Sequence, residues 1–323
     1  MPDDHLTNLH EIRDKLPPLD ESLYNLNEEE ASFYKQQTGI QDDEELKRHI
    51  IAIQTEAYAV CAFHSSRCML NSCWRQQVFP FPCITTFHFA KLKISHLPAY
   101  PQLLKLGKQR PGAIFLDIGC CFGNDAFKAI ADDYPLKNVV ASDLYQGFWD
   151  AGLKLFKRTP ETYPVPFIAG DVFDHANLEP VPVFTVASPP TTPRPVLKDL
   201  TSLNPLRGHV SAIHASSFFH LFQEDPQLEL ARALACLLSP EPGSMIFGMH
   251  SGLPEKGFRV TPIADRKMFC HSPDSWKELW DGVVFEKGTV KVEAEIVPVT
   301  GEELGGLYPN IKFWWLNWSV TRL

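Results

Sequence analysis

After Leu97 the sequence alternates between short apolar runs and longer amphipathic segments, and this alternation most restricts the possible folds. The apolar runs are the expected strands, at residues 113–119, 138–144, 165–173, 209–219 and 244–251. Segments with helical spacing lie between them, at residues 124–134, 147–158 and 227–238. A sequence that alternates in this way is typical of a parallel sheet with helices packed on it.

Two further strand-like runs stand near the C-terminus, at residues 291–299 and 313–323. A turn-rich stretch joins them, which favours an antiparallel hairpin at one edge of the sheet. Its aromatic residues Phe313 and Trp315 are expected in the core, packed against a helix. The predicted fold class is therefore α/β, with five parallel strands followed by a hairpin.

The first hundred residues follow a different pattern. Residues 1–22 are polar and contain proline, so we expect a flexible leader. Residues 23–100 are expected to form a helical cap, since two segments place acids in a first helical turn and apolar residues behind them. Within the cap, residues 61–77 lack clean periodicity, and an insertion or a continued helix with a loop are both open. Residues 101–323 are the expected ligand-binding domain.

The composition excludes several classes of function. A net charge of −9 argues against nucleic acid as a partner, because phosphate binding needs a basic face. The sequence has neither an apolar stretch of the roughly 20 residues that a membrane span needs nor a visible secretory signal, so we expect a cytoplasmic protein with reduced cysteines. Four of the eight cysteines cluster between Cys61 and Cys83. Their spacing lacks the close ligand pairs of structural zinc sites, and no metal is expected.

The stretch LDIGCCFGNDAF suggests a ligand site at the end of the first strand. Asp117 is followed by Gly119 and Gly123, and then by a helix. Glycine lets the backbone bend and approach a ligand closely. A dinucleotide fingerprint would read G-x-G-x-x-G, whereas Cys121 stands here in the place of its second glycine. A ligand without a diphosphate is therefore favoured.

Two more acids are expected at strand ends. Asp143 closes the second strand, where doubly wound nucleotide folds hold ribose hydroxyls, and Asp171 follows the third. Each acid alone could equally well cap the segment that follows it. Together with Asp117 they predict an anionic edge, which suits a sulfonium, a ribose and an adenine. The residues therefore favour S-adenosylmethionine as the cofactor.

The runs DIGCCFGND, VVASDL and AGDVFD resemble class I S-adenosylmethionine-dependent methyltransferases. More narrowly, the chain from Tyr24 to Leu323 resembles fungal carboxyl O-methyltransferases of meroterpenoid pathways, notably at YNLNEEEASFYKQQTGIQDDEELKRHI, FPFPCI and HASSFFHLF. These enzymes methylate a farnesylated aromatic acid. The resemblance implies a Rossmann-like fold with a mostly parallel seven-stranded sheet, a small hydrophobic substrate and a homodimer.

The resemblance also implies roles for individual residues. The expected cofactor contacts lie at strand ends or in the turn after the first strand: Asp117, Gly119, Cys120 and Gly123 around methionine, Asp143 at the ribose, and Leu144, Asp171 and Val172 around adenine. His214 and Ser216 follow the fourth strand and are the expected catalytic residues, which would position the substrate. The proline-dense loop at residues 188–208 lies near where a substrate lid could sit, and residues 79–83 could form an apolar substrate wall.

The acceptor group stays open at this stage. A carboxylate is ionised near neutral pH and needs no base, whereas a phenol, with a pKa of about 10, would gain from one. The candidate bases are His214, His220, His250 and His271. A substrate acid would bind a cation, and the candidates are Arg194, Arg207 and Arg259. The alternatives to a methyltransferase are a catalytically silent protein with this fold and, less favoured, an NAD-dependent dehydrogenase.

Overall fold

The computed structural model describes residues 18–68, 82–260, 267–299 and 312–323. The chain divides into two compact units, one formed by Met1–Lys91 with Gly147–Tyr163 and the other by Leu92–Gln146 with Pro164–Leu323. The second unit contains the sheet and all the candidate site residues.

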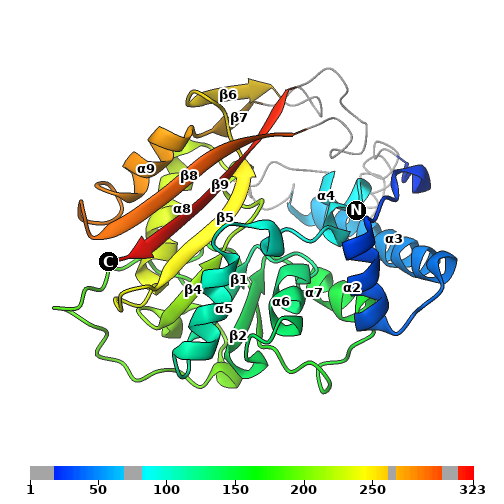
Figure 1. Ribbon diagram of the computed structural model, residues 1–323, viewed down its shortest axis with the longest axis horizontal. Helices are drawn as coiled ribbons and strands as arrows, with labels where there is room; N and C mark the ends of the chain where they lie inside the picture. The colour runs from blue at the N-terminus through cyan, green and yellow to red at the C-terminus, as the bar shows by residue number, and fades with distance from the viewer. Residues whose placement is uncertain (1–17, 69–81, 261–266, 300–311) are drawn as a thin grey trace, which may run out of the picture. The chain divides into compact units, whose positions relative to one another are not determined.

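The sheet of the second unit has seven strands in the order β3-β2-β1-β4-β5-β9-β8 (Figure 1). Its strands are β1 Ile114–Ile118, β2 Val139–Asp143, β3 Phe167–Ala169, β4 Val210–His214, β5 Met245–Ser251, β8 Val290–Val299 and β9 Phe313–Arg322. The first five are parallel, and β9 runs antiparallel to both β5 and β8. The predicted sheet and its C-terminal hairpin are confirmed, with β8 at the edge.

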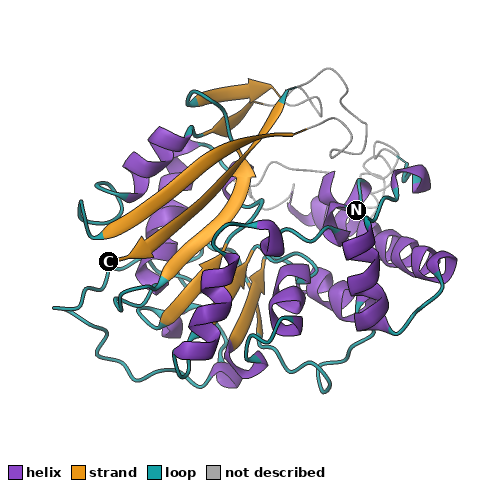
Figure 2. Cartoon of the chain, in the orientation of Figure 1, coloured by secondary structure: helices purple, strands orange, loops and turns teal. Residues whose placement is uncertain are grey.

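Helices lie on both faces of this sheet (Figure 2). The unit contains α5 Tyr100–Gln109, α6 Asn124–Ala131, α8 Glu224–Leu237, α9 Pro273–Trp280 and the short 3-10 helices η3 Ile94–His96, η4 Leu136–Asn138, η5 Leu197–Asp199, η6 Asn204–Leu206 and η7 Phe219–Leu221. Side chains alternate along a strand. Ile114 and Leu116 of β1 therefore share a core with α8 and α9. Phe115 lies on the opposite face of the sheet, and its ring centroid is 5.4 Å from that of Tyr134, which follows α6 in the chain.

Helix α9 begins with a capping box. Ser272 accepts a hydrogen bond from the amide of Ser275, whose hydroxyl in turn accepts one from the amide of Ser272, and Pro273 occupies the first turn. Such a reciprocal cap satisfies two amides that the helix itself leaves unpaired. In β9, the prediction that Phe313 and Trp315 lie in the core is wrong. Leu316 and Trp318 are the buried residues, whereas Phe313 and Trp315 are only half-buried.

A small antiparallel hairpin, absent from the sequence-based expectation, stands outside the main sheet. It pairs β6 Gly257–Val260 with β7 Lys267–Cys270. The hairpin follows β5 directly, so it begins at the carboxyl end of that strand. It thus adds side chains to the edge of the sheet where open α/β folds bind their ligands.

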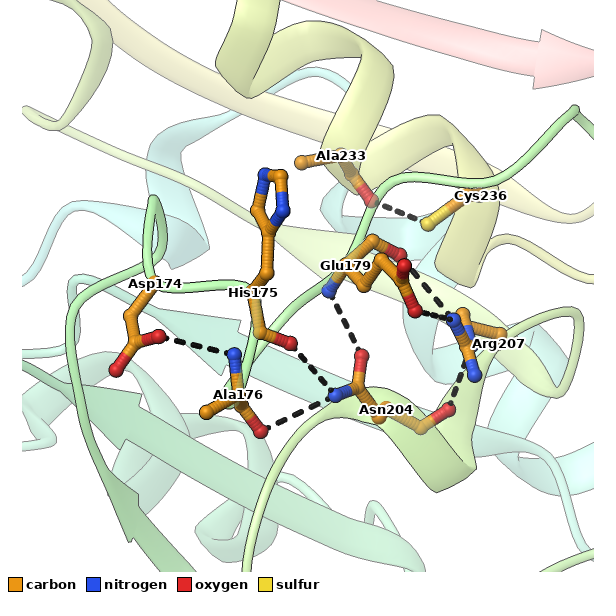
Figure 3. Close-up of polar contacts among 8 residues, drawn as sticks. All are labelled: Asp174, His175, Ala176, Glu179, Asn204, Arg207, Ala233 and Cys236. Carbon is orange, nitrogen blue, oxygen red and sulfur yellow. Dashed lines mark hydrogen bonds and ion pairs between the residues drawn. The ribbon is translucent and has the colours of Figure 1, made fainter.

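The loop at residues 188–208 lies elsewhere than predicted. Arg194 donates to the carbonyl of Gly112 and to the side chain of Asn138, which directly precede β1 and β2. The loop therefore reaches the amino ends of these strands. Asn204 ties it to the segment after β3, where it donates to the carbonyls of His175 and Ala176 (Figure 3). A parallel sheet binds ligands at its carboxyl ends, so the loop does not supply the predicted lid.

The first unit is helical where it is described. Its elements are η1 Glu21–Leu23, α2 Glu28–Thr38, α3 Asp43–Cys68, α4 Pro82–Thr85, η2 His88–Ala90 and most of α7 Gln146–Leu155. Asn27 and Glu30 form a capping box at the start of α2, and Phe156 stacks on Tyr34 at 5.4 Å. Residues 61–77, for which an insertion and a continued helix with a loop are both open, begin inside α3 and then leave the described residues. Both readings therefore stay open, and the leader and the cap boundary stay predictions.

Among the described residues, no helix combines the length and the apolar character needed to cross a bilayer.

Candidate functional site

The turn after β1 has a backbone that glycine makes possible. Gly119 has a φ of +66°, and a Cβ at this position would lie 2.8 Å from the ring of Phe218. The amides of Gly119 and Cys120 both donate to the carbonyl of Ser142, which fixes the turn against β2. Cys121 is also left-handed, with a φ of 52°, although it carries a side chain. The turn is thus compact and closely packed on one side.

Asp143 connects the end of β2 to this turn. Its Oδ2 accepts a hydrogen bond of 2.8 Å from the amide of Cys121. Burial raises the pKa of Asp143 to about 6, although backbone amides, first that of Cys121, oppose the shift. The carboxylate is therefore ionised above pH 6 and is poorly solvated, so it can gain by accepting hydrogen bonds from a ligand. This is the place predicted for the ribose contact.

Asp117, His214 and Ser216 form a buried chain of hydrogen bonds. Asp117 lies at the end of β1 opposite His214 of β4 in the strand register, and its Oδ1 is 2.8 Å from the imidazole Nδ1. The imidazole Nε2 is 2.7 Å from Oγ of Ser216, which also accepts the amide of Met249. His214 and Asp117 are 1% and 2% exposed. These hydrogen bonds therefore fix the orientation of the Asp117 carboxylate.

The charges of this pair depend on each other. Burial alone would lower the pKa of His214, but its hydrogen bond to Asp117 and the charges of Asp117 and Asp125 raise it. Burial raises the pKa of Asp117, against the opposing effect of His214. Asp117 Oδ2 is buried and makes no hydrogen bond of normal geometry within the described residues, although the amide of Ala126 acts on the carboxyl and lowers its pKa. It is thus available to a cationic or hydrogen-bond-donating ligand.

The same order of side chains occurs in serine hydrolases. Here Ser216 is itself buried, and its oxygen already accepts a backbone amide. A hydroxyl in that setting braces His214 rather than facing a substrate. His214 and Ser216, predicted as catalytic, are therefore brought together with Asp117, and their role in catalysis stays a prediction.

The remaining predicted cofactor contacts are less distinctive. Asp171 lies two residues beyond β3, and its Oδ1 accepts the amide of Phe173. This is a local turn of the kind expected if the acid only caps the segment that follows it. Val172 is buried in the core, and Leu144 is half-buried. Gly123, with a φ of +74°, is the N-cap of α6. Their contacts with a cofactor stay predictions.

Cys120 is unsuited to nucleophilic chemistry. Burial, and then the charges of Asp117 and Asp143, raise the pKa of its thiol well above the ordinary range. A thiolate is the reactive form, so this cysteine is inert near neutral pH. Among the described residues, no group of three or more histidines, cysteines and acids could hold a metal ion. Most of the expected wall at residues 79–83 lies outside the described residues.

The candidate bases other than His214 are held as hydrogen-bond acceptors or in the core. Nδ1 of His220 accepts the amide of Ser251 at 3.2 Å, and Nδ1 of His250 accepts the indole of Trp318 at 2.9 Å. Burial is the main cause that lowers the pKa of both, to about 3 for His220. A neutral imidazole that accepts at Nδ1 carries its proton on Nε2, so neither ring has a free basic nitrogen.

His271 packs in the same aromatic core, between Phe269 and Trp276. Its Nδ1 is 2.9 Å from the hydroxyl of Ser275, and burial lowers its pKa to about 4. Both ring nitrogens of His214 are engaged, by Asp117 and by Ser216. His271 is therefore a weak base because its pKa is low, and His214 has no free nitrogen, so the four candidate histidines offer no ready general base to an acceptor hydroxyl.

The candidate arginines are clearly distinguished by position. Arg194 is bound at the amino ends of the strands, as described above. Arg207 is paired with Glu179, at 3.4 Å, and its Nε donates to the carbonyl of Asn204 (Figure 3). Arg259, on β6, instead donates to the hydroxyl of Ser251 at the carboxyl end of β5. Only Arg259 of these three thus lies at the ligand-binding edge.

Two residues near this edge escaped the sequence-based reasoning. Ser251 is the last residue of β5 and contacts both Arg259 and His220. Lys93 acts electrostatically on both His214 and His220. The signal for Ser251 was its place at the end of a parallel strand, the same signal that identified Asp117 and Asp143. Lys93 precedes a short 3-10 helix, and its sequence context gives no such signal.

The residues at this edge fit the predicted cofactor. The unpartnered Asp117 Oδ2 and the Asp143 carboxylate provide two acceptors around a glycine turn. A sulfonium with an amino group and a ribose diol supplies positive charge and donors, whereas a diphosphate would be repelled by both acids. The site therefore matches S-adenosylmethionine better than a dinucleotide.

Known proteins resemble this chain in sequence. A profile of the meroterpenoid methyltransferase N-terminal domain matches residues 19–90. The chain is 30% identical over 270 residues to Asnovolin E/Chermesin D methyltransferase nvfJ of Aspergillus novofumigatus, which covers 84% of this chain and 81% of that protein. It is 36% identical over 213 residues to O-methyltransferase phiE of a fungal species (strain ATCC 74256). That match covers 66% of this chain and 63% of the relative, so the chain spans less than two thirds of it.

A solved structure shows a more distant likeness. The 1,6-didemethyltoxoflavin-N1-methyltransferase of Burkholderia thailandensis aligns with 85% of this chain and 89% of its own, at 13% identity and a TM-score of 0.43. A TM-score this low supports no conclusion about this chain beyond those drawn from the sequence comparisons.

Proposed function

Because the chain belongs to the fungal meroterpenoid methyltransferases, a group of class I S-adenosylmethionine-dependent enzymes, we propose that it methylates a carboxyl oxygen of a small, largely apolar acid. The observation that carries this choice of acceptor is the state of the four histidines. Both ring nitrogens of His214 are engaged, and burial lowers the pKa of the other three rings. None of the four is therefore poised as the base from which a phenol would gain. A carboxylate needs none.

When bound, S-adenosylmethionine would supply an electrophilic methyl group, with its sulfonium sulfur as the leaving group for an attacking acceptor oxygen. The protein's part is to hold the acceptor oxygen in line and to exclude water. Asp117 would hold the methionine end, and its hydrogen bond to His214 keeps the carboxylate from turning away. Asp143 would accept the ribose hydroxyls, and the turn at Gly119 would bring the backbone close to the ligand.

The test uses labelled S-adenosylmethionine with a fungal metabolite extract that has been separated into acidic and phenolic fractions. We expect label to move into the acidic fraction. Transfer only into the phenolic fraction would overturn the choice of acceptor. Cofactor binding without any transfer would instead favour a catalytically silent protein, and binding of NAD without S-adenosylmethionine would overturn the whole proposal.

Two further expectations belong to this proposal. We expect the enzyme to act in the cytoplasm, where cysteines stay reduced. We also expect a homodimer, which light scattering after size-exclusion chromatography would test.

A further inference from the structure

Arg259 has an unusual environment for a guanidinium group. Its Nη2 donates to Ser251 Oγ at 3.3 Å and contacts the sulfur of Met268 at 3.5 Å. The guanidinium lies over the ring of Phe313, 4.2 Å from its centroid. These contacts fix the orientation of the planar group, because a ring below it and a hydroxyl at one end leave little freedom to turn.

Two of the three guanidinium nitrogens nevertheless have no partner. Nε and Nη1 are buried and make no hydrogen bond within the described residues. No carboxylate of that same part of the chain forms an ion pair with Arg259 either. A charge removed from water without a partner is strongly unfavourable. Nε and Nη1 lie on different edges of the guanidinium plane, because each fork of two donors includes Nη2, which donates to Ser251. Each of the two nitrogens without a partner can still donate a charge-assisted hydrogen bond to a ligand anion.

His220 provides another donor near the same place. Its Nδ1 accepts the amide of Ser251, whose side chain accepts Arg259, so Ser251 joins the two groups. Burial and the positive charges of Arg259 and Lys93 lower the pKa of His220 to about 3. The ring is therefore neutral at pH 7, and the accepting Nδ1 leaves the proton on Nε2. Its free nitrogen can donate to an anion.

The position of this cluster separates it from the expected cofactor contacts. In the sheet, β4 stands between β1 and β5, so Ser251 lies two strands from the glycine turn. Two strand spacings amount to roughly 10 Å. The acids Asp117 and Asp143 belong to the β1 and β2 side, and Arg259 with His220 to the β5 side. The side chains at this edge of the sheet thus change from acidic on the β1 and β2 side of β4 to basic on the β5 side.

We propose that Arg259 and His220, held together by Ser251, bind the carboxylate of the methyl acceptor. This inference rests on the proposed function and adds the residues that select an acid over an uncharged acceptor. One carboxylate oxygen would accept a hydrogen bond from an unpartnered nitrogen of Arg259, and the imidazole N–H of His220 would orient the group. The second oxygen can then face the methyl donor on the other side of β4. Phe313 and Ser251 are positioning residues, since they act through Arg259.

The other carboxylate available in this reaction is that of the cofactor itself. The distance across the sheet argues against it, because the methionine end is expected at the turn after β1. The test separates the two sources by measuring each affinity on its own. If Arg259 served the cofactor, its removal would weaken binding of S-adenosylhomocysteine.

The experiment compares the intact protein with Arg259→Met and Arg259→Lys, and with Arg232→Met as the matched control. Arg232 is an exposed arginine on α8. The probes are 1-naphthoate and biphenyl-4-carboxylate, each paired with its phenol, 1-naphthol or 4-phenylphenol. Affinities are measured by titration calorimetry in saturating S-adenosylhomocysteine, and the affinity for S-adenosylhomocysteine is measured separately. Thermal unfolding of each variant shows whether it is folded.

We expect the unaltered protein to bind at least one acid about tenfold or more tightly than its phenol, as charge-assisted hydrogen bonds imply. Arg259→Met should weaken binding of that acid by about 10- to 100-fold and leave the phenol and S-adenosylhomocysteine unchanged. Arg259→Lys should keep part of the preference, because a point charge remains without the fixed planar donors. His220→Phe should give a smaller loss, and Arg232→Met none.

Three results would overturn the inference. They are an acid preference that survives Arg259→Met, a loss of S-adenosylhomocysteine affinity in that variant, and an unaltered protein that prefers none of the acids. A failure of the proposed function looks different. In that case the unaltered protein does not bind S-adenosylhomocysteine, or it transfers label only to phenols whatever stands at position 259.

Discussion

Replacement of Asp143 by asparagine should stabilise the fold while it weakens cofactor binding. The carboxyl has a pKa of about 6 against an ordinary value of 3.8, chiefly because burial disfavours the charge. The difference of 6 − 3.8, about 2 pKa units, corresponds to about 3 kcal/mol at 1.36 kcal/mol per unit. Asparagine is uncharged, and its oxygen can still accept the amide of Cys121. Asp143→Asn should therefore raise the free energy of unfolding at pH 8 by up to about 3 kcal/mol.

The pH dependence follows from the sign of the shift. The folded state holds this proton more tightly than the unfolded state, so the stability of the unaltered protein falls as pH rises from about 4 to 6. At pH 5 the folded carboxyl is mostly protonated. The advantage of Asp143→Asn should then shrink to about half of its value at pH 8.

Urea unfolding at pH 8 and pH 5 tests the stability, and calorimetry tests the affinity for S-adenosylhomocysteine. We expect that affinity to fall about 10- to 100-fold in Asp143→Asn, because a carboxylate accepts hydroxyls more strongly than an amide. Asp199→Asn, at an exposed carboxylate of η5, is the matched control and should change neither quantity. A variant that is no more stable at pH 8 would refute the account of the pKa. Unchanged cofactor affinity would refute the ribose assignment.

Three further experiments test other parts of the site: two substitutions and one chemical labelling. Gly119→Ala should lower the free energy of unfolding by about 2–4 kcal/mol, since it adds left-handed strain and a Cβ only 2.8 Å from a phenylalanine ring; Gly112→Ala, with a similar φ and no such clash, should lower it less. His214→Phe leaves a buried carboxylate unpaired and should lower stability by about 3–5 kcal/mol, part of which Asp117→Asn should restore in the double variant; strictly additive losses would contradict the coupling. Cys120 should react with iodoacetamide at pH 7.5 more than about tenfold slower than free cysteine, and fast labelling on a mass spectrum would contradict its raised pKa.

The strand pattern and the acids at strand ends could be predicted because both depend on local sequence. An apolar run followed by Asp117 and Gly119 specifies a strand and a turn without knowledge of the rest of the chain. The partner of Asp117 could not be predicted in this way. His214 lies 97 residues further on, and it meets Asp117 only because β4 pairs with β1 in one particular register.

The arginine at the ligand edge illustrates the same limit. The sequence alone could not show which of the three candidate arginines binds a substrate acid, since all three follow strands or lie in loops. The choice of Arg259 depends on the β6–β7 hairpin, which has too few residues to give a clear pattern. The aromatic run at the start of β9 was ambiguous for a related reason. Consecutive large residues hide the alternation that would show which of them, such as Trp315 or Trp318, faces the core.

The central claim is that the acceptor oxygen belongs to a carboxylate, and the chemistry of the product tests it most directly. A methyl ester is cleaved by mild alkali and releases methanol, whereas a methyl ether of a phenol is stable. The enzyme is incubated with S-adenosylmethionine labelled in its methyl group and an acidic metabolite fraction, and the product is then treated with mild base. We predict that the transferred label is released as volatile methanol. Label that stays with the product after this treatment would contradict the account.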